Sequence, residues 1–309
     1  MVHEIFTISF NLFKLMIPII IIVKVIEELG GIKYIGQALE PVMQLVGLPA
    51  SMGLVWATTM ISNIYAGMII FINTQETLSV AQVTVLGGMM LFAHSLPIEI
   101  RIMQKAGVRV LYTLLLRLGG ALLLGIILHQ IYSSEDWLNQ TNTPVWNPDI
   151  NPDTNLTAWV LTQIKMLFQI FLIISGLIIF LRLLKLSGIE KLIAWILQPL
   201  LKLLGMSNKT SLIAIIGMTL GLTYGGGLLI NEAQSDRVSK TDIFGSITLL
   251  AICHSIIEDT ILIMLLGADI TGALYFRVLF ALLLTAILIR LARNLSVKHF
   301  DRYFVYPGK

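Results

Sequence analysis

Long apolar segments alternate with short polar stretches along the whole chain. A helix needs about 20 mostly apolar residues to cross a bilayer. Segments of this kind lie at 7–27, 50–73, 80–100, 109–132, 157–181, 211–230, 242–264 and 272–292. Two shorter apolar stretches, 33–47 and 189–204, contain a proline and polar residues, so each is a short crossing, a re-entrant segment or an interfacial helix. The pattern predicts an all-α polytopic membrane protein with about ten transmembrane segments.

The composition agrees with a membrane protein. Of the 309 residues, 56% are hydrophobic and only 13% are charged, against about 25% charged in soluble domains. The mean hydropathy is +0.86. These values exclude a soluble enzyme, a secreted domain and a nucleic-acid-binding protein, and they make the lipid bilayer the first partner. The single cysteine, Cys253, excludes an internal disulfide and a cysteine-based metal cluster.

The chain contains an internal repeat. The polar segment 133–156, which lacks Lys and Arg, separates a first repeat at 1–132 from a second at 157–292, and a basic, aromatic tail follows at 293–309. At an offset of 160 residues, the second repeat matches the first at several polar positions that chance similarity between leucine-rich helices does not explain. The matches are His94-Ser95 with His254-Ser255, Glu99 with Asp259, Gly107 with Gly267, and Arg117 with Arg277.

The distribution of basic residues predicts that the two repeats are inverted. The loop 101–109 is basic, but the equivalent 261–269 has no basic residue; 74–79 has none, but its equivalent 231–240 has two. Cytoplasmic loops carry the excess of Lys and Arg, so equivalent loops lie on opposite sides. We therefore expect five segments per repeat, both termini and a solvated tail in the cytoplasm, an extracytoplasmic linker, and a bacterial inner-membrane location. Eight crossings with parallel repeats are the alternative.

The most informative residues are ionisable ones inside the predicted membrane segments, because such residues are costly in lipid and usually functional. Histidine titrates near physiological pH, and inverted repeats bring equivalent segments together near the midplane, where transporters bind substrate. The sequence therefore predicts a cluster that carries a coupling proton or binds a cation. The alternative is a structural hydrogen-bond cluster. The expected members are His94, Glu99, His254, Glu258 and Asp259; a metal site, if there is one, would use His94, His254 and Asp259.

A glycine-rich segment at 219–232 predicts an interrupted helix. Three consecutive glycines weaken a helix by about 1 kcal/mol each, and interrupted helices offer free backbone groups to substrates. Packing of small residues between helices is the alternative explanation. The predicted substrate-binding residues from this segment, its first-repeat counterpart and the two His-Ser pairs are Asn63, Tyr65, Tyr224, Gly225, Gly226, Gly227, Asn231, Glu232, Ser95 and Ser255.

Arg117 and Arg277 lie near the middle of equivalent segments. An arginine reaches the membrane surface only from near a helix end. We therefore expect structural ion pairs with Glu99, Glu258 or Asp259, the alternative being contact with an anionic substrate. The chain has no GxxxxGK[ST], HExxH or GxSxG motif, so no enzymatic activity is predicted.

Residues 222–244 (beginning LTYGGGLLINEA) and 253–270 (beginning CHSIIEDT) resemble the nucleoside recognition, or Gate, domain. Residues 62–73 and 93–107 resemble a diverged second copy, in which Ile98 stands where the second copy has Glu258 and only Gly67 remains of the glycine run. Gate domains occur in concentrative nucleoside transporters, ferrous iron transporters and spore maturation membrane proteins. The resemblance implies a transport protein with two copies of the domain, whose binding sites are not equivalent.

Together these features predict an ion-coupled secondary transporter of a small, nucleoside-like polar solute, bound at the midplane between inverted repeats that alternate access. The expected coupling ion is H⁺, Na⁺ or a divalent cation, and no other cofactor is expected. A divalent metal ion transporter and a non-transporting membrane scaffold or partner subunit are the alternatives. The sequence also allows a homodimer.

Overall fold

The protein is described by a computed structural model that covers residues 2–74, 76–148, 155–233 and 238–306. These residues form α-helices and one π-helix and contain no strand longer than an isolated bridge. The first half contains α1 (Val2–Glu28), α2 (Gly31–Leu45), α3 (Met52–Ile61), α4 (Ile64–Thr74), α5 (Val80–Phe92), α6 (Leu96–Lys105) and α7 (Val110–Ser134). The second contains α8 (Leu156–Ser187), α9 (Ile189–Leu203), α10 (Asn208–Leu220), α11 (Leu222–Ala233), α12 (Lys240–Ile252), α13 (Glu258–Leu265), η1 (Thr271–Phe276), α14 (Arg277–Asn294) and α15 (Val297–Tyr303).

Among the described residues, five helical segments are long and apolar enough to cross a membrane. They are α1, α5 with α6, α7, α8, and η1 with α14. The apolar windows of α1 and α8 are only 22% and 17% buried, so most of their hydrophobic surface faces outward. The two helices contact each other, with the rings of Phe6 and Phe171 5.4 Å apart. Such exposed apolar surface fits contact with lipid.

Two predicted spans, 50–73 and 211–230, are helical hairpins instead of single helices. In a continuous helix, residues eight positions apart are separated by about 12 Å. In the structure, a Cβ atom added to Gly225 would overlap the backbone of Gly217, and one added to Gly67 would meet the side chain of Thr59. Helices α10 and α11 therefore fold back on each other at Gly221, and α3 and α4 do so at Ser62 and Asn63.

Polar contacts also join the open ends of these hairpins. The Ser51 hydroxyl donates to the Glu76 carboxylate at 2.7 Å, and the Lys209 ammonium lies 2.6 Å from the Glu232 carboxylate. Each contact joins the start of the first arm to the end of the second. The sequence predicted an interruption at the glycine-rich segment, but periodicity alone did not reveal that the chain reverses direction there.

The predicted spans 80–100 and 242–264 are each two helices separated by an irregular break. Helix α5 ends before Ala93 and α6 begins after Ser95, while α12 ends before Cys253 and α13 begins after Ile257. Ser95 and Ser255 occupy the same left-handed backbone conformation, with φ of 48° and 46°. Backbone N–H groups freed by the breaks donate to carbonyls of the hairpins' first arms, from Ser95 to Thr59 at 3.1 Å and from Ile256 to Met218 at 2.7 Å. The hairpin tips thus contact the broken helices.

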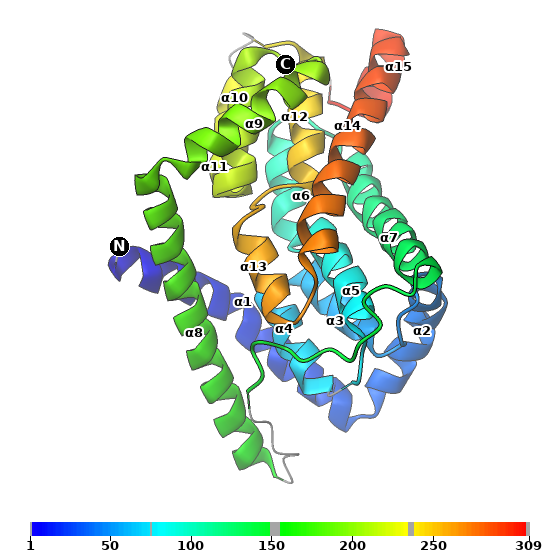
Figure 1. Ribbon diagram of the computed structural model, residues 1–309, viewed down its shortest axis with the longest axis vertical. Helices are drawn as coiled ribbons and strands as arrows, with labels where there is room; N and C mark the ends of the chain where they lie inside the picture. The colour runs from blue at the N-terminus through cyan, green and yellow to red at the C-terminus, as the bar shows by residue number, and fades with distance from the viewer. Residues whose placement is uncertain (1, 75, 149–154, 234–237, 307–309) are drawn as a thin grey trace.

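The elements of the two halves follow the same order: a long helix, a short helix, a hairpin, a broken helix and another long helix. The hairpin α3–α4 lies in the lower half of the molecule, and α10–α11 lies toward its upper end (Figure 1). Between them, α5 packs against α7 and α12 packs against α14, and the halves also interlock, because α12 contacts α7 and α5 contacts η1. The core therefore contains broken helices from both halves.

Helices α2 and α9 are 15 residues each, so they are about 22 Å long, which is shorter than the roughly 30 Å hydrocarbon core. They correspond to the ambiguous stretches 33–47 and 189–204. Each leads from a long helix to a hairpin, and neither is among the candidate spans of the described residues. Their length fits helices that lie along a membrane surface.

Most of the residues that the structure describes in the tail 293–309 are exposed, but the tail is also anchored to the core. Helix α15 folds back, and Phe300 and Val305 are buried. The Arg109 guanidinium donates to the carbonyls of Asp301 and Val305, and Phe300 packs edge-on against Phe244. The apolar phenylalanines explain the docking, because exposing them to water is unfavourable.

The hairpin contact gives a testable prediction. Gly225→Ala should lower the free energy of unfolding by about 1–3 kcal/mol, since its methyl group meets the Gly217 backbone, which cannot rotate away. Gly227→Ala is the matched control, because nothing lies within 4 Å of an added Cβ there. Thermal unfolding in detergent measures both. Equal melting temperatures for the two variants would contradict the hairpin packing.

Candidate functional site

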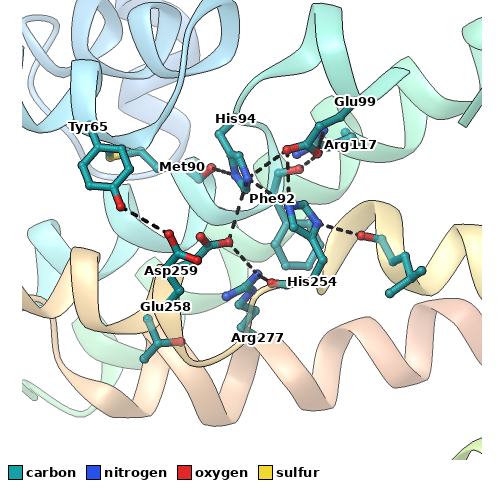
Figure 2. Close-up of polar contacts among 12 residues, drawn as sticks. Tyr65, Met90, Phe92, His94, Glu99, Arg117, His254, Glu258, Asp259 and Arg277 are labelled. Carbon is teal, nitrogen blue, oxygen red and sulfur yellow. Dashed lines mark hydrogen bonds and ion pairs between the residues drawn. The ribbon is translucent and has the colours of Figure 1, made fainter. Parts of the chain in front are cut away.

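Two histidines, one from each half, face each other in the centre of the protein. His94 lies in the break between α5 and α6, and His254 lies in the break between α12 and α13. Their Nε2 atoms are 3.0 Å apart, and their exposed fractions are 5% and 3%. The Glu99 Oε1 atom lies 3.1 Å from the Nε2 of His94 and 3.3 Å from that of His254 (Figure 2). Three polar atoms therefore converge on one point.

The hydrogen bonds of the two rings determine which nitrogen carries a proton. Nδ1 of His94 lies 3.1 Å from the carbonyl oxygen of Met90, and Nδ1 of His254 lies 2.8 Å from that of Leu250. A carbonyl oxygen only accepts, so each Nδ1 must be the protonated donor. In the neutral rings both Nε2 atoms then carry lone pairs. The site therefore brings two imidazole lone pairs and a carboxylate oxygen together, an arrangement that requires a bound cation or an added proton.

A buried arginine fixes the Glu99 carboxylate. Arg117, on α7, is 0% exposed; it donates through Nη1 to the Glu99 Oε2 atom and through Nε to the Phe92 carbonyl at 2.8 Å. The Phe92 carbonyl is freed where α5 ends. One guanidinium thus provides a hydrogen-bond donor for the free carbonyl of a broken helix and also orients a carboxylate. The other Glu99 oxygen is left pointing at the histidines.

The second half repeats this arrangement with looser contacts. Arg277, also 0% exposed, donates to the His254 carbonyl at 2.7 Å, but its Nη2 atom lies 3.8 Å from the Asp259 carboxylate. Asp259 Oδ2 is 3.9 Å from the Nε2 of His94 and accepts no hydrogen bond from the residues that the structure describes. Asp259 is one methylene shorter than Glu99, which explains why it does not reach the histidines as closely.

Tyr65 joins the hairpin of the first half to the acidic pair of the second. Its hydroxyl, on α4, donates to Glu258 at 3.2 Å, and Glu258 begins α13 (Figure 2). A matching contact joins the hairpin of the second half to the broken helix of the first, because α11 packs against α6 with Gly226 next to Ile102. Each hairpin therefore contacts the broken helix of the opposite repeat.

Asn63 lies in the tip of the first hairpin. Its Oδ1 atom accepts from the Ala66 N–H at 2.9 Å, and its Nδ2 atom is buried without a partner among the described residues. The Ser62 hydroxyl is likewise buried and unpaired within that part of the chain. Such groups are unfavourable unless a ligand or water satisfies them.

The remaining predicted residues have different places. Ser95 and Ser255 contribute the left-handed turns of the breaks, and a Cβ added to Gly221 would lie 2.9 Å from the Ser255 hydroxyl. Gly225 packs against Gly217 in the hairpin. Gly227 lies further along α11 with open space beside it, Asn231 lies near the far end of that helix, and Glu232 pairs with Lys209 at the hairpin's open end. The side chain of Tyr224 lies outside the described residues.

Sequence reasoning missed the groups that connect the hairpins to the breaks. These are the Thr59 and Met218 carbonyls, which accept from the break N–H groups, and the small residue Gly217. A signal was present, because Thr59 and Thr219 match at the same 160-residue offset and both hydroxyls bond the carbonyl four residues earlier. The match identified a shared local structure without showing what it contacts.

Comparison with known proteins places the chain in a family. The sequence is 30% identical over 284 residues to the uncharacterised membrane protein YvoD of Bacillus subtilis (strain 168), covering 91% of this chain and 90% of YvoD. The chain belongs to the YvoD family of membrane proteins. No family model matches the sequence, so its likeness to the Gate domain stays a prediction.

Among solved structures, the chain is similar to that of CNTnw in an inward-facing, substrate-bound state. The TM-score is 0.49 at 14% sequence identity, and the alignment covers 89% of this chain and 73% of that one.

The buried ion pair predicts a specific pattern of stability. Arg117→Gln should lower the free energy of unfolding by about 3–5 kcal/mol, because Glu99 then stays buried without its partner. The double variant Glu99→Gln with Arg117→Gln should recover part of that loss. Arg290→Gln, at an exposed position on α14, is the control. Chemical unfolding in detergent measures all three; a loss for Arg117→Gln no larger than for Arg290→Gln would contradict a paired, buried charge.

Proposed function

We propose that this protein is a secondary membrane transporter whose two halves hold a cation between His94, His254 and Glu99 and couple its movement to a small polar solute. The observation that carries the proposal is the approach of two imidazole Nε2 atoms and a carboxylate oxygen within 3.0–3.3 Å in the protein interior. Each half supplies one histidine. Relative movement of the halves would therefore change the site directly.

The charges around the site support a cation. Five ionisable side chains besides the histidines gather there: the carboxylates of Glu99, Glu258 and Asp259 and the guanidiniums of Arg117 and Arg277. Formally the carboxylates outnumber the guanidiniums by one. Unpaired charge is costly inside a membrane, so a bound proton or metal cation would stabilise the cluster.

The arrangement of elements supports inverted halves with fewer crossings than the ten expected from the sequence. We infer six crossings: α1, α5 with α6, α7, α8, α12 with α13, and η1 with α14. Both hairpins would then enter partway from opposite sides, in line with their positions toward opposite ends of the molecule (Figure 1). Three crossings per half is an odd number, so the halves are inverted. Helices α2 and α9 would lie along opposite surfaces.

This topology fits the basic residues better than ten crossings do. Both termini, the loop 101–109, α9 and the start of α10 lie on the cytoplasmic side, and the linker 135–155 lies outside. Lys209, which the ten-crossing scheme leaves outside, moves to the basic side. The positive-inside rule therefore supports six crossings in a bacterial cytoplasmic membrane.

The solute site is inferred at the hairpin tips. The Asn63 Nδ2 atom and the Ser62 hydroxyl, which have no partner among the described residues, are at the first tip, and Tyr65 and Glu258 lie between this tip and the histidines. Interrupted helices that offer polar groups near the midplane are the usual substrate sites of secondary transporters. These hydrogen-bonding groups suit a small polar solute, and the Gate-domain resemblance favours a nucleoside.

Transport tests the proposal. Protein reconstituted in liposomes should accumulate radiolabelled uridine or adenosine when a gradient of H⁺, Na⁺ or a divalent cation is imposed. His94→Gln should weaken cation binding about 10- to 100-fold, the effect of losing an interaction with a charged group worth about 1.5–3 kcal/mol, and uptake should fall accordingly. His299→Gln, at an exposed position on α15, should leave uptake unchanged. Flux equal to that of protein-free liposomes for nucleosides, nucleobases and organic acids under every gradient would reject the proposal.

The topology has its own test. In a Cys253→Ala background, Ser51→Cys should react with a membrane-impermeant maleimide added to intact cells, and Lys209→Cys should react only after the membrane is opened. Ten crossings predict the reverse for both positions, because they place residue 51 inside and residue 209 outside. Labelling in that reverse pattern would overturn the six-crossing scheme.

A further inference from the structure

We propose that the cation held by His94, His254 and Glu99 is a divalent first-row transition metal of the zinc class, bound by Nε2 of each histidine and by Oε1 of the glutamate. The inference rests on the proposed function for its role, since the metal would be the cation that the transporter moves. The geometry of the site, the hydrogen bonds behind its ligands and the donor types do not depend on that role.

The spacing of the three atoms fits one small ion. Zinc binds imidazole nitrogen at about 2.0–2.1 Å and carboxylate oxygen at about 2.0–2.2 Å, usually in a tetrahedral arrangement that sets neighbouring ligand atoms roughly 3.3 Å apart. The observed separations are 3.0, 3.1 and 3.3 Å. A point about 2 Å from all three atoms therefore exists just outside their plane. Three protein ligands leave a fourth position open, as in zinc sites that exchange a ligand.

The contacts behind these ligands are those expected of a metal site. A metal-binding histidine usually donates its other ring N–H to a backbone carbonyl or carboxylate, which fixes the tautomer and aims the lone pair. Both histidines do so, to Met90 and Leu250. The carboxylate ligand is held in turn by Arg117. Each ligand is therefore oriented by a hydrogen bond through its other polar atom, and all three metal-facing atoms are free to coordinate.

The donor types select the class of metal. Imidazole nitrogen suits zinc, iron, cobalt, nickel and copper, whereas Mg²⁺ and Ca²⁺ prefer six or more oxygen ligands. A monovalent alkali ion also prefers oxygen, and two of the three donors here are nitrogen. A divalent ion changes the formal balance of the cluster from one negative to one positive charge, so the donor types and not the charge count select it over a monovalent ion. Asp259 Oδ2, which accepts no hydrogen bond from the described residues, lies 3.9 Å from the Nε2 of His94 (Figure 2).

Cobalt is the probe, because tetrahedral Co²⁺ absorbs visible light far more strongly than hydrated octahedral Co²⁺. The full-length protein, purified with a tag that lacks histidine, should develop these bands on titration with Co²⁺ and reach saturation at one ion per chain. Excess Zn²⁺ should remove them. His94→Gln, His254→Gln and Glu99→Gln should each weaken binding about 10- to 100-fold. His129→Gln and His299→Gln, which change histidines elsewhere in the chain, should bind Co²⁺ like the wild type.

X-ray absorption on zinc-loaded wild-type protein gives a second test that does not require a ligand variant to fold. It should detect two imidazoles and one or two oxygen ligands. Absence of tetrahedral cobalt bands, binding that the ligand variants leave unchanged, or a zinc shell without imidazole would overturn the inference and leave a shared proton as the cation. Uptake of solute without metal binding would overturn the metal site while preserving the transporter; metal binding without any flux would support the site and reject the transporter.

Discussion

The structure depends on one constraint: polar backbone groups buried at membrane depth must find partners within the protein. Two helices, one from each half, are broken in the interior, and their freed N–H and C=O groups cannot reach water. Hairpin carbonyls accept from the freed N–H groups, and buried arginines donate to the freed carbonyls of Phe92 and His254. The hairpins, the breaks and the arginines therefore form one hydrogen-bonded system, in which the hairpins and the arginines supply the partners that the broken helices lack.

The histidine site follows from this system. An arginine that donates to the free carbonyl of a broken helix brings a positive charge into the interior, and that charge requires a carboxylate partner. Glu99 meets Arg117 and has one oxygen left for the histidines, whereas the shorter Asp259 stays farther from Arg277. The repeat therefore supplies two similar frameworks whose arginine-facing carboxylates differ in length by one methylene. An asymmetric site, with one close carboxylate and one distant one, results from that difference.

Much of the site was predictable from sequence, because the repeat singled out polar residues that leucine-rich packing does not explain. His94 and His254 share an offset, and so do Glu99 and Asp259, and these residues lie together. The direction of the chain was not predictable. Hydropathy over 211–230 is the same for a crossing helix and for a hairpin, and only the contact between Gly217 and Gly225 distinguishes them. The reversal carries Asn231 and Glu232 to the far end of α11, away from the hairpin tip, and their substrate-binding role stays a prediction.

The polar segments at the two ends of the core fasten the halves together. The linker donates and accepts backbone bonds beside Leu78 and reaches Leu266 through the Asn142 amide, so it ties α5 to the end of α13. The tail is bound by Arg109 at the start of α7 and by Lys240 at the start of α12, both through Asp301.

These ties hold α5, α7, α12 and α14 as one framework around the histidines. The two hairpins pack on this framework along their length as well as at their tips; α10 and α11 contact α12, α3 contacts α5, and Gly226 lies against Ile102. In the proposed transporter, movement of a hairpin relative to this framework would change access to the site without separating α5 from α7 or α12 from α14. Since the tips lie against the breaks that carry His94 and His254, a hairpin that moved away would also remove the backbone hydrogen bonds that hold these breaks in shape.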